Sequence, residues 1–458
     1  MSQREGLNRR AFLRNAGVTA LVGAVGTGGA AEAFGATKAE PLSDFAEPPN
    51  GKYDFDTPYN RFGTDSVKYD QQVRMYGKDH IQVGMGIADM DFKAPPCIGR
   101  ALAQRCQHEN WGYLDVPKSY YENIAAWNKR RYGLNIDPET IVLSTGVHPG
   151  IIAALRVFSP PGTKVLLTTP TYNGFYGDLT YTGTKPEDSP MKLVDGRYSI
   201  DFEDLEKRIG PDTNTLILCN PQNPTGNCWS PDDLMRIGEL CLKKRVVVLA
   251  DEIHCDFVTK DAKYTPFATL PNKAVVNNSL TFKAASKSFS LAAMKHAWFF
   301  STNPDYLARV KAMNRADLTT LGMIANNSVL TEGEDWLNQV LPYIEGNHEF
   351  AVQYVKANMP LVKCVKPQGT YLAWLDLSAA MERVGAKQKA MEATKKAGKT
   401  VTPEQAMVDW FVEHAKVHLN AGSSYGTGGQ GHARMNIATS RKTLETALNN
   451  MSAALKTL

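Results

Sequence analysis

Lys287 lies between two serines in the stretch ASKSF (285–289), shortly before the apolar run AWFF (297–300). Lysine is a strongly hydrated cation, so most isolated lysines lie on a protein surface and do no chemistry. An uncharged lysine amine, however, forms an imine with an aldehyde. Lys287 is therefore a candidate for covalent chemistry only if other residues supply the rest of a site.

Asp251 is the second candidate, because it follows five apolar residues in RVVVLADEIH (245–254) and has no basic neighbour. A buried carboxylate is costly unless a cation pairs with it, and a protonated pyridine nitrogen is one such cation. Asn223 precedes a turn in NPQNPTG (220–226), and Tyr172 could stack on an aromatic ring. TGVHPG (145–150) opens a helical stretch, whose free N–H groups could bind a phosphate. Aldehyde, pyridine ring and phosphate together describe pyridoxal 5′-phosphate.

The elements that must position these residues alternate between strand and helix. Runs typical of strands are TIVLS (140–144), KVLLTT (164–169), TLILCN (215–220), RVVVLAD (245–251) and HAWFFS (296–301). Helical periods occur in 150–158 and 231–244. This alternation predicts a mostly parallel sheet covered by helices, in which ligands bind beyond the carboxyl ends of the strands. The polar segments at 145–150, 170–176, 220–227, 251–256 and 286–290 all follow such runs.

After about residue 330 the pattern changes to a long helix at 336–359 and strands at 369–377 and 431–439. A chain of 458 residues is too long for one simple core. We therefore expect an N-terminal arm (37–80), a large domain (81–330) and a smaller α+β domain (331–458). The lysine-rich stretch 387–399 is expected to be a solvated insertion or loop.

These motifs resemble those of the fold-type I pyridoxal-phosphate enzymes of the class I and II aminotransferase superfamily. Within it they are most similar to the C–S β-lyases of the MalY and PatB type. The resemblance spans about residues 53–455 and rests on 53–70, ADMDF (88–92), NWGYLDVP (110–117), NPQNPTG, DEIHCDF (251–257) and SKSFSLAAMK (286–295). It implies an α/β fold with a mostly parallel seven-stranded sheet flanked by helices and a smaller C-terminal α+β domain.

The resemblance also implies a role for each matching residue. Lys287 would bind the cofactor aldehyde and later move protons, and Asp251 would pair with the pyridinium nitrogen. Asn223 and His254 would hydrogen-bond the 3-oxygen of the ring, on which Tyr172 stacks. The phosphate would be bound by the backbone of Gly146, Val147 and His148 and by Ser286 and Lys295.

Two further residues complete the implied site. Arg434, in ARMNIA, would bind the substrate carboxylate in bidentate fashion. Tyr113 would reach the phosphate of a neighbouring subunit, which implies a homodimer with shared active sites.

The resemblance favours β-elimination, in which cystathionine or a cysteine S-conjugate gives a thiol, pyruvate and ammonia. The residues alone leave transamination and racemisation open, because all three reactions begin with loss of the Cα proton. A regulatory protein that merely binds the cofactor is a further alternative, against which the complete catalytic set argues.

The N-terminus carries a second kind of signal. NRRAFLRNAG (8–17) precedes a Gly/Ala-rich apolar run that ends in the Ala-Glu-Ala triplet 31–33. Residues 1–36 thus resemble a twin-arginine signal peptide, which implies the twin-arginine export machinery as a partner and a periplasmic or otherwise exported protein. A membrane anchor is the weaker alternative, because the run is short and rich in glycine.

Composition and charge exclude several other classes of function. The net charge of +4 is small for this length and gives no reason to expect nucleic-acid binding. The seven cysteines form no CxxC pair, so we expect neither a zinc site nor a disulfide framework. We expect most of them to be buried as small apolar residues.

Overall fold

The computed structural model describes residues 45–458, so the predicted signal peptide lies outside the described residues. The main sheet has seven strands in the order β2 (Val142–Ser144), β10 (Ala297–Phe300), β9 (Ser279–Lys283), β8 (Val247–Asp251), β7 (Thr213–Cys219), β3 (Lys164–Thr169) and β4 (Lys185–Pro190). All neighbours are parallel except that β10 runs antiparallel to both β9 and β2. The predicted mostly parallel, seven-stranded sheet is confirmed.

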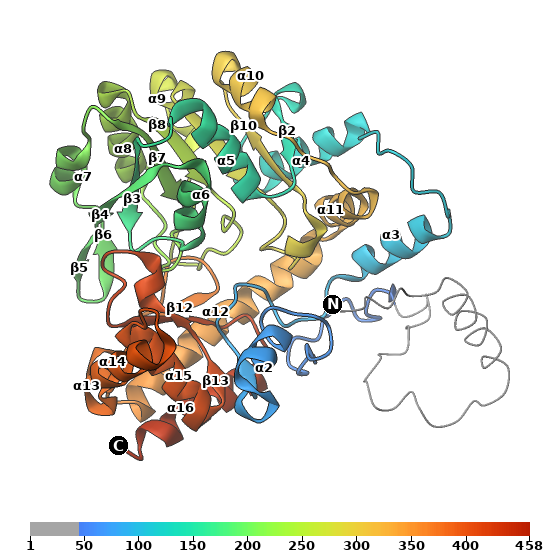
Figure 1. Ribbon diagram of the computed structural model, residues 1–458. Coiled ribbons are helices and arrows are strands. Elements are labelled where there is room, and N and C mark those ends of the chain that lie inside the picture. Colours follow the sequence, from blue (N-terminus) through green and yellow to red (C-terminus); the bar gives the residue numbers. More distant parts are fainter. Residues whose placement is uncertain (1–44) are drawn as a thin grey trace, which may run out of the picture. The chain divides into compact units, whose positions relative to one another are not determined.

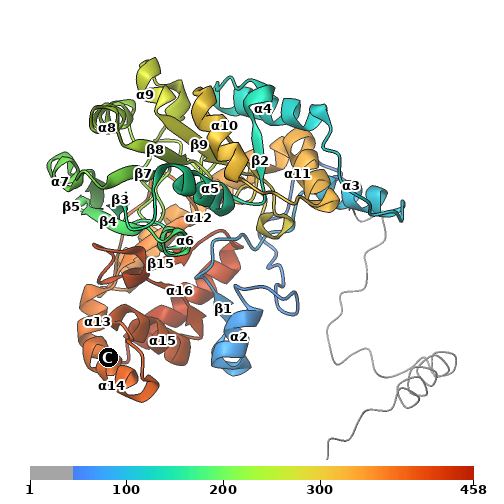
Figure 2. The same cartoon turned by 45° about the horizontal axis from the view of Figure 1, so that its top comes forward.

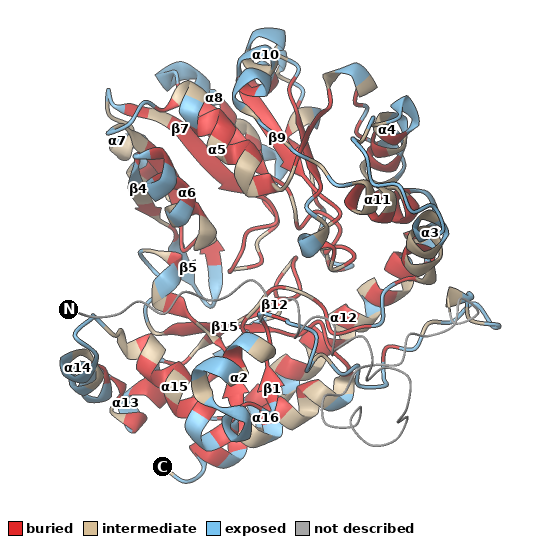
Figure 3. Cartoon of the chain, turned by 45° about the vertical axis from the view of Figure 1, so that its right-hand side comes forward, coloured by how far each residue is buried: buried red, intermediate tan, exposed pale blue. Residues whose placement is uncertain are grey.

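Helices cover both faces of this sheet (Figures 1 and 2). Side chains that alternate along the strands pack on one face against α5 (Val147–Phe158), α6 (Gly174–Thr182) and α10 (Pro304–Met313). The opposite face packs against α7 (Phe202–Arg208), α8 (Pro231–Lys244) and α9 (Lys273–Asn277). Strands β7 and β9 are consequently buried along most of their length (Figure 3). Burial on both faces explains the continuous apolar run LILC (216–219) of β7.

Local sequence accounts for where these elements begin and end. Ser230 caps α8 in a capping box with Asp233, and Pro231 occupies the first helical position. Strand β8 is Val-Val-Leu-Ala-Asp, and its β-branched residues suit a pleated strand. Its last residue is Asp251, so the chain leaves the buried sheet at the predicted carboxylate.

A second sheet is antiparallel, in the order β11 (Lys363–Cys364), β12 (Leu372–Asp376), β15 (His432–Asn436) and β14 (Asn420–Ala421). The helices of this half are α12 (Glu334–Asn358), α13 (Ser378–Val384), α14 (Ala386–Ala397), α15 (Pro403–Ala415) and α16 (Arg441–Leu455). The long helix and the two strands predicted after residue 330 are confirmed as α12, β12 and β15. The domain boundaries themselves stay a prediction.

The remaining elements lie outside the two sheets of seven and four strands. The helices are α2 (Asp70–Tyr76), α3 (Pro96–Cys106), α4 (Lys118–Tyr132) and α11 (Thr320–Glu332). Strand β1 (Val83–Gly84) pairs in parallel with β13 (Val417–His418), and β5 (Lys192–Val194) forms a hairpin with β6 (Arg197–Ser199). Residues just after the predicted arm therefore pair with a strand near the C-terminus.

The expectation of a loop at 387–399 is wrong. Most of this stretch lies in α14, whose residues Ala386 and Ala390 are buried while the lysines are exposed. Alanine, lysine, glutamine, methionine and glutamate all favour helices, and the stretch lacks glycine and proline until Gly398. The lysines form the solvated face of a helix.

The cysteines are mostly buried, as predicted. All seven are free thiols, of which Cys106 is exposed and Cys364 is partly exposed. In the described part of the chain, no helix is long and apolar enough to cross a membrane.

Candidate active site

A cavity of about 430 Å³ lies beyond the carboxyl ends of β7 and β8, beside the first turn of α5. It brings together ten of the twelve predicted site residues, from five separate segments of the chain: Gly146, Val147, His148, Tyr172, Asn223, Asp251, His254, Ser286, Lys287 and Lys295. The parallel topology explains this convergence, because all these segments leave the same edge of the sheet.

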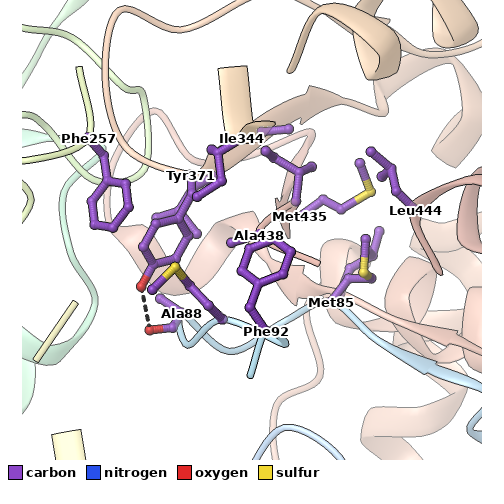
Figure 4. Packing of buried hydrophobic residues seen from close by; sticks show 14 of the residues in the cluster. Met85, Ala88, Phe92, Phe257, Ile344, Tyr371, Met435, Ala438 and Leu444 are labelled. Carbon is purple, nitrogen blue, oxygen red and sulfur yellow. Dashed lines mark hydrogen bonds between the residues drawn. The ribbon is translucent and has the colours of Figure 1, made fainter. Parts of the chain in front are cut away.

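Lys287 lines this cavity and is partly buried, and its Nζ donates a hydrogen bond to the carbonyl oxygen of Ala88 at 3.0 Å. The hydroxyl of Tyr371 donates to the same oxygen at 2.9 Å, within an apolar cluster that includes Phe92 and Phe257 (Figure 4). Burial, followed by the positive charge of Arg434, lowers the pKa of Lys287 to about 8. A buried amine with a lowered pKa is a better nucleophile near neutral pH.

Asp251 is buried and accepts a hydrogen bond from the backbone N–H of Ile253 at 3.1 Å. Within residues 45–458, no lysine, arginine or histidine forms a salt bridge with it. Burial raises the pKa of Asp251 to about 6, against the opposing effects of the Ile253 N–H, His148 and Lys287. A buried carboxylate without a close cation fits a ligand that brings a positive charge, such as a protonated pyridine nitrogen.

Arg434 lies on β15, next to the cavity, and is 2% exposed. Its Nη1 donates to Oδ1 of Asn223 at 3.1 Å, and its Nη2 donates to the carbonyl oxygen of Gly86 at 2.7 Å. Its Nε has no partner in the described structure. The guanidinium is therefore held in place with N–H groups to spare, as a carboxylate receptor requires.

His254 is a buried neutral imidazole. Burial, with the positive charges of Lys287 and Arg434, lowers its pKa well below the ordinary value. Its Nδ1 is buried without a partner among the described residues. A buried nitrogen without a hydrogen-bond partner beside a cavity indicates a site where a polar ligand binds.

The end of the cavity beside α5 suits an anion. Gly146 is the N-cap of this 12-residue helix, whose first N–H groups lack helical acceptors. Ser286 and Lys295 line the same cavity and add a hydroxyl and a cation. Phosphate, ring and aldehyde positions are thus all provided for, and the residues fit pyridoxal 5′-phosphate.

Tyr113 does not line the cavity; it lies between α3 and α4 and is fully exposed in the single chain. Its predicted contact with a neighbouring subunit stays a prediction. The sequence analysis missed Asp178, a buried carboxylate on α6 that contacts His148. The rule that singled out Asp251 applies to it as well, because Asp178 stands in the apolar helix GFYGDLTYT.

A larger cavity, of about 510 Å³, lies between the β5–β6 hairpin and the second sheet. None of the twelve predicted residues lines it. Its lysines pair with carboxylates, Lys363 with Asp376 and Lys366 with Glu345 and Glu349. We therefore assign the chemistry to the smaller cavity.

Residues 80–451 match the family described as aminotransferase class I and II. The chain belongs to this family. The cystathionine beta-lyase PatB of Bacillus subtilis is 35% identical over 408 residues, which are 88% of this chain and 99% of that relative.

Two solved structures that contain pyridoxal 5′-phosphate are similar to this chain. Cystalysin from Treponema denticola, which contains a pyridoxal 5′-phosphate cofactor, has a TM-score of 0.80 and 28% identity, covering 89% of this chain and 99% of its own. The pyridoxal-phosphate-bound C–S lyase from Staphylococcus hominis has a TM-score of 0.78 and 27% identity, covering 88% and 99%.

Proposed function

We propose that this protein is a pyridoxal 5′-phosphate-dependent C–S β-lyase that cleaves cystathionine or cysteine S-conjugates. The products are a thiol, pyruvate and ammonia, with one water consumed. The observation that carries the proposal is the meeting of Lys287, Asp251 and Arg434 at one buried site in a chain 35% identical to a cystathionine beta-lyase.

The cofactor, when bound, withdraws electrons from the substrate and makes the Cα proton acidic. Arg434 binds the substrate carboxylate, and its bonds to Asn223 and Gly86 fix the orientation of the substrate. The Lys287 amine removes the Cα proton, for which its lowered pKa suits it. The Asp251 carboxylate would keep the pyridine nitrogen of a bound cofactor protonated, which favours departure of the thiolate from Cβ of the substrate once the Cα proton is lost.

The same residues serve other outcomes of Cα deprotonation. Amino transfer is the second candidate, because the family match itself is to aminotransferases. Elimination is preferred because the PatB relative is named a cystathionine beta-lyase and the Staphylococcus hominis structure is described as a C–S lyase.

A product assay tests the choice. The purified protein, loaded with pyridoxal 5′-phosphate, is given cystathionine, cysteine or an S-alkyl cysteine, and pyruvate and free thiol are measured together. We expect the two products in equal amounts. Amino-group transfer to an added keto acid without thiol release would instead support the aminotransferase.

We also propose that residues 1–36 are a twin-arginine signal peptide and that the folded protein acts in the periplasm. The paired Arg9 and Arg10, the apolar run and the triplet 31–33 support this proposal. Export in a folded state suits a protein that acquires its cofactor in the cytoplasm. Fractionation of cells that produce the Arg9→Lys, Arg10→Lys variant tests it, since active protein should then remain in the cytoplasm.

We also propose that the chain divides into an arm and two domains. The seven-stranded sheet draws its strands from residues 142–300, and the four-stranded sheet draws its strands from residues 363–436. This separation supports a large domain (81–330) and a small domain (331–458), with the arm (37–80) before them. Limited proteolysis near residue 330 would test the boundary.

A further inference from the structure

His148 and Asp178 form a hydrogen-bonded pair at the cavity for which the proposed reaction supplies no role. Nδ1 of His148, in the first turn of α5, lies 2.7 Å from Oδ2 of Asp178 on α6. Nε2 of the same ring lies 3.3 Å from the hydroxyl oxygen of Tyr172. The imidazole therefore links a buried carboxylate to the tyrosine that is predicted to stack on the cofactor.

The packing around this link leaves Tyr172 little freedom. A Cβ at Gly174 would lie 2.5 Å from His148 Cε1 and 2.6 Å from Tyr172 Cε1, so only glycine allows both rings to approach the start of α6. The Phe175 ring meets Tyr172 edge-on, with ring centroids 5.4 Å apart. Tyr172 is thus held by backbone, by an aromatic ring and by the imidazole.

Charged groups around the pair shift the pKa of His148. His148 faces Asp178 on α6, Tyr172 before α6, Asp251 at the end of β8 and Lys287 after β9. Burial and Lys287 lower the pKa of His148, but the hydrogen bond and charge of Asp178, with a contribution from Asp251, outweigh them and raise it overall. Burial and the charge of Asp178 raise the pKa of Asp251, whereas the charge of His148 lowers it.

We propose that Asp178 and His148 are positioning residues for the cofactor: they hold Tyr172 at the ring position and place a positive charge within reach of Asp251. This inference rests on the proposed function in that the ligand is pyridoxal 5′-phosphate. Asp178 keeps the Nδ1–H of His148 in place, and the protonated imidazole favours the carboxylate form of Asp251, which the pyridinium requires.

The first test uses the cofactor-free protein and does not depend on activity. Histidine side chains labelled with ¹⁵N are titrated by NMR, and the His148 signal is assigned from its loss in His148→Gln. We expect His148 to titrate above the ordinary histidine range and Asp178→Asn to lower its midpoint by about one pH unit or more. A His148 that titrates in the ordinary range and is unmoved by Asp178→Asn would overturn the proposal.

The second test uses the loaded protein. His148→Gln removes the charge but keeps an amide that can reach Tyr172, and His80→Gln on the exposed surface is the matched control. We expect His148→Gln to weaken the visible circular dichroism of the bound cofactor and to move the acid limb of the kcat profile upward by about one pH unit. If the acid limb of the kcat profile and the visible circular dichroism of His148→Gln equal those of His80→Gln, His148 does not position the cofactor.

Failure of the proposed function has a different signature. If the protein transfers amino groups instead of releasing thiol, the product assay changes, while the His148 titration and the dichroism of the bound cofactor do not. If the cofactor itself does not bind, the visible dichroism is absent in the wild type as well. The NMR titration then still decides whether Asp178 holds His148 protonated.

Discussion

At the scale of single residues, the site depends on groups whose charge is set by burial. Asp251 is buried and Lys287 is partly buried, and this loss of hydration shifts each pKa toward the neutral form. An amine with a pKa of about 8 and a carboxyl with a pKa of about 6 both exchange protons near neutral pH. Such pairs of shifted groups in one cavity are typical of active sites.

The pKa of Lys287 predicts how fast the cofactor-free protein captures pyridoxal 5′-phosphate. Only the neutral amine attacks the aldehyde, and with a pKa of about 8 roughly one molecule in ten carries it at pH 7. Below pH 8 we expect the capture rate to rise about tenfold per pH unit, and above pH 8 to level off. Stopped-flow absorbance measures this rate.

Lys287→Ala serves as the control for that experiment. It should bind the cofactor without the visible band of a lysine-linked aldehyde and should lose nearly all turnover, whereas Lys260→Ala on the surface should change neither. Full activity in Lys287→Ala would refute the assignment of this lysine and with it the proposed reaction.

Asp251→Asn tests the second residue. The amide is similar in shape to the carboxylate but cannot stabilise a pyridinium charge. We expect the cofactor to bind and kcat to fall by several orders of magnitude, each tenfold loss being about 1.4 kcal/mol of transition-state stabilisation. Steady-state kinetics with cystathionine gives the ratio, and an unchanged kcat would mean that Asp251 is only structural.

At the scale of helices and strands, sequence patterns predicted those elements whose apolar residues recur with a clear local period. The apolar run before Asp251 is β8, and the capped amphipathic stretch at 231–244 is α8. The antiparallel direction of β10 could not be predicted in this way, because a continuous apolar run does not show whether a strand pairs in parallel or antiparallel with its neighbours. The hydrogen bond between His148 and Asp178 could not be predicted either, because it joins two different helices. Helix α5 ends at Phe158 and α6 begins at Gly174.

A second network of contacts joins the end of β9 to the residue that follows β8. Lys283, the last residue of β9, is buried, and its Nζ lies 3.6 Å from Glu252 Oε2 and 3.2 Å from Cys255 Sγ. Glu252 also accepts hydrogen bonds from Tyr264 and from the backbone of Phe267. Because Glu252 follows Asp251, this network anchors the end of β8.

Removing the cation from this network should destabilise the fold. Lys283→Met leaves the Glu252 carboxylate buried without its cation, and we expect the free energy of unfolding to fall by about 3 kcal/mol or more. Adding Glu252→Gln removes the uncompensated charge and should restore part of the loss. Urea unfolding of the cofactor-free protein measures both, with Lys260→Met as the exposed control; equal stability of all variants would contradict the argument.

At the scale of the whole molecule, the site forms only when distant parts of the chain meet. The carbonyl oxygen of Ala88 accepts hydrogen bonds from both Lys287 and Tyr371, and Arg434 of the second sheet donates to Asn223, in the loop that follows β7 of the first sheet. Residues from the N-terminal quarter, the main sheet and the C-terminal sheet therefore set the position of one lysine and one substrate receptor. Cofactor binding should accordingly depend on both sheets being folded.

We predict that a second subunit completes the site. Tyr113 is fully exposed in a single chain, and Trp111 beside it is half exposed, so this loop presents aromatic side chains to solvent. Exposed aromatic residues of this kind are typical of interfaces. If Tyr113 binds the phosphate of its neighbour, a Tyr113→Ala subunit lacks nothing in its own half of the site but fails to complete the other.

Mixed dimers test this arrangement directly. Lys287→Ala and Tyr113→Ala proteins are purified separately, unfolded together, refolded with cofactor and assayed for thiol release. Lys287→Ala alone should be inactive and Tyr113→Ala alone weak. Random pairing makes half of the dimers hybrid, and each hybrid has one site with both native residues, so activity should reach about a quarter of wild type. If Tyr113 instead acts within its own chain, every site lacks one residue and the mixture gains nothing over the average of its parents.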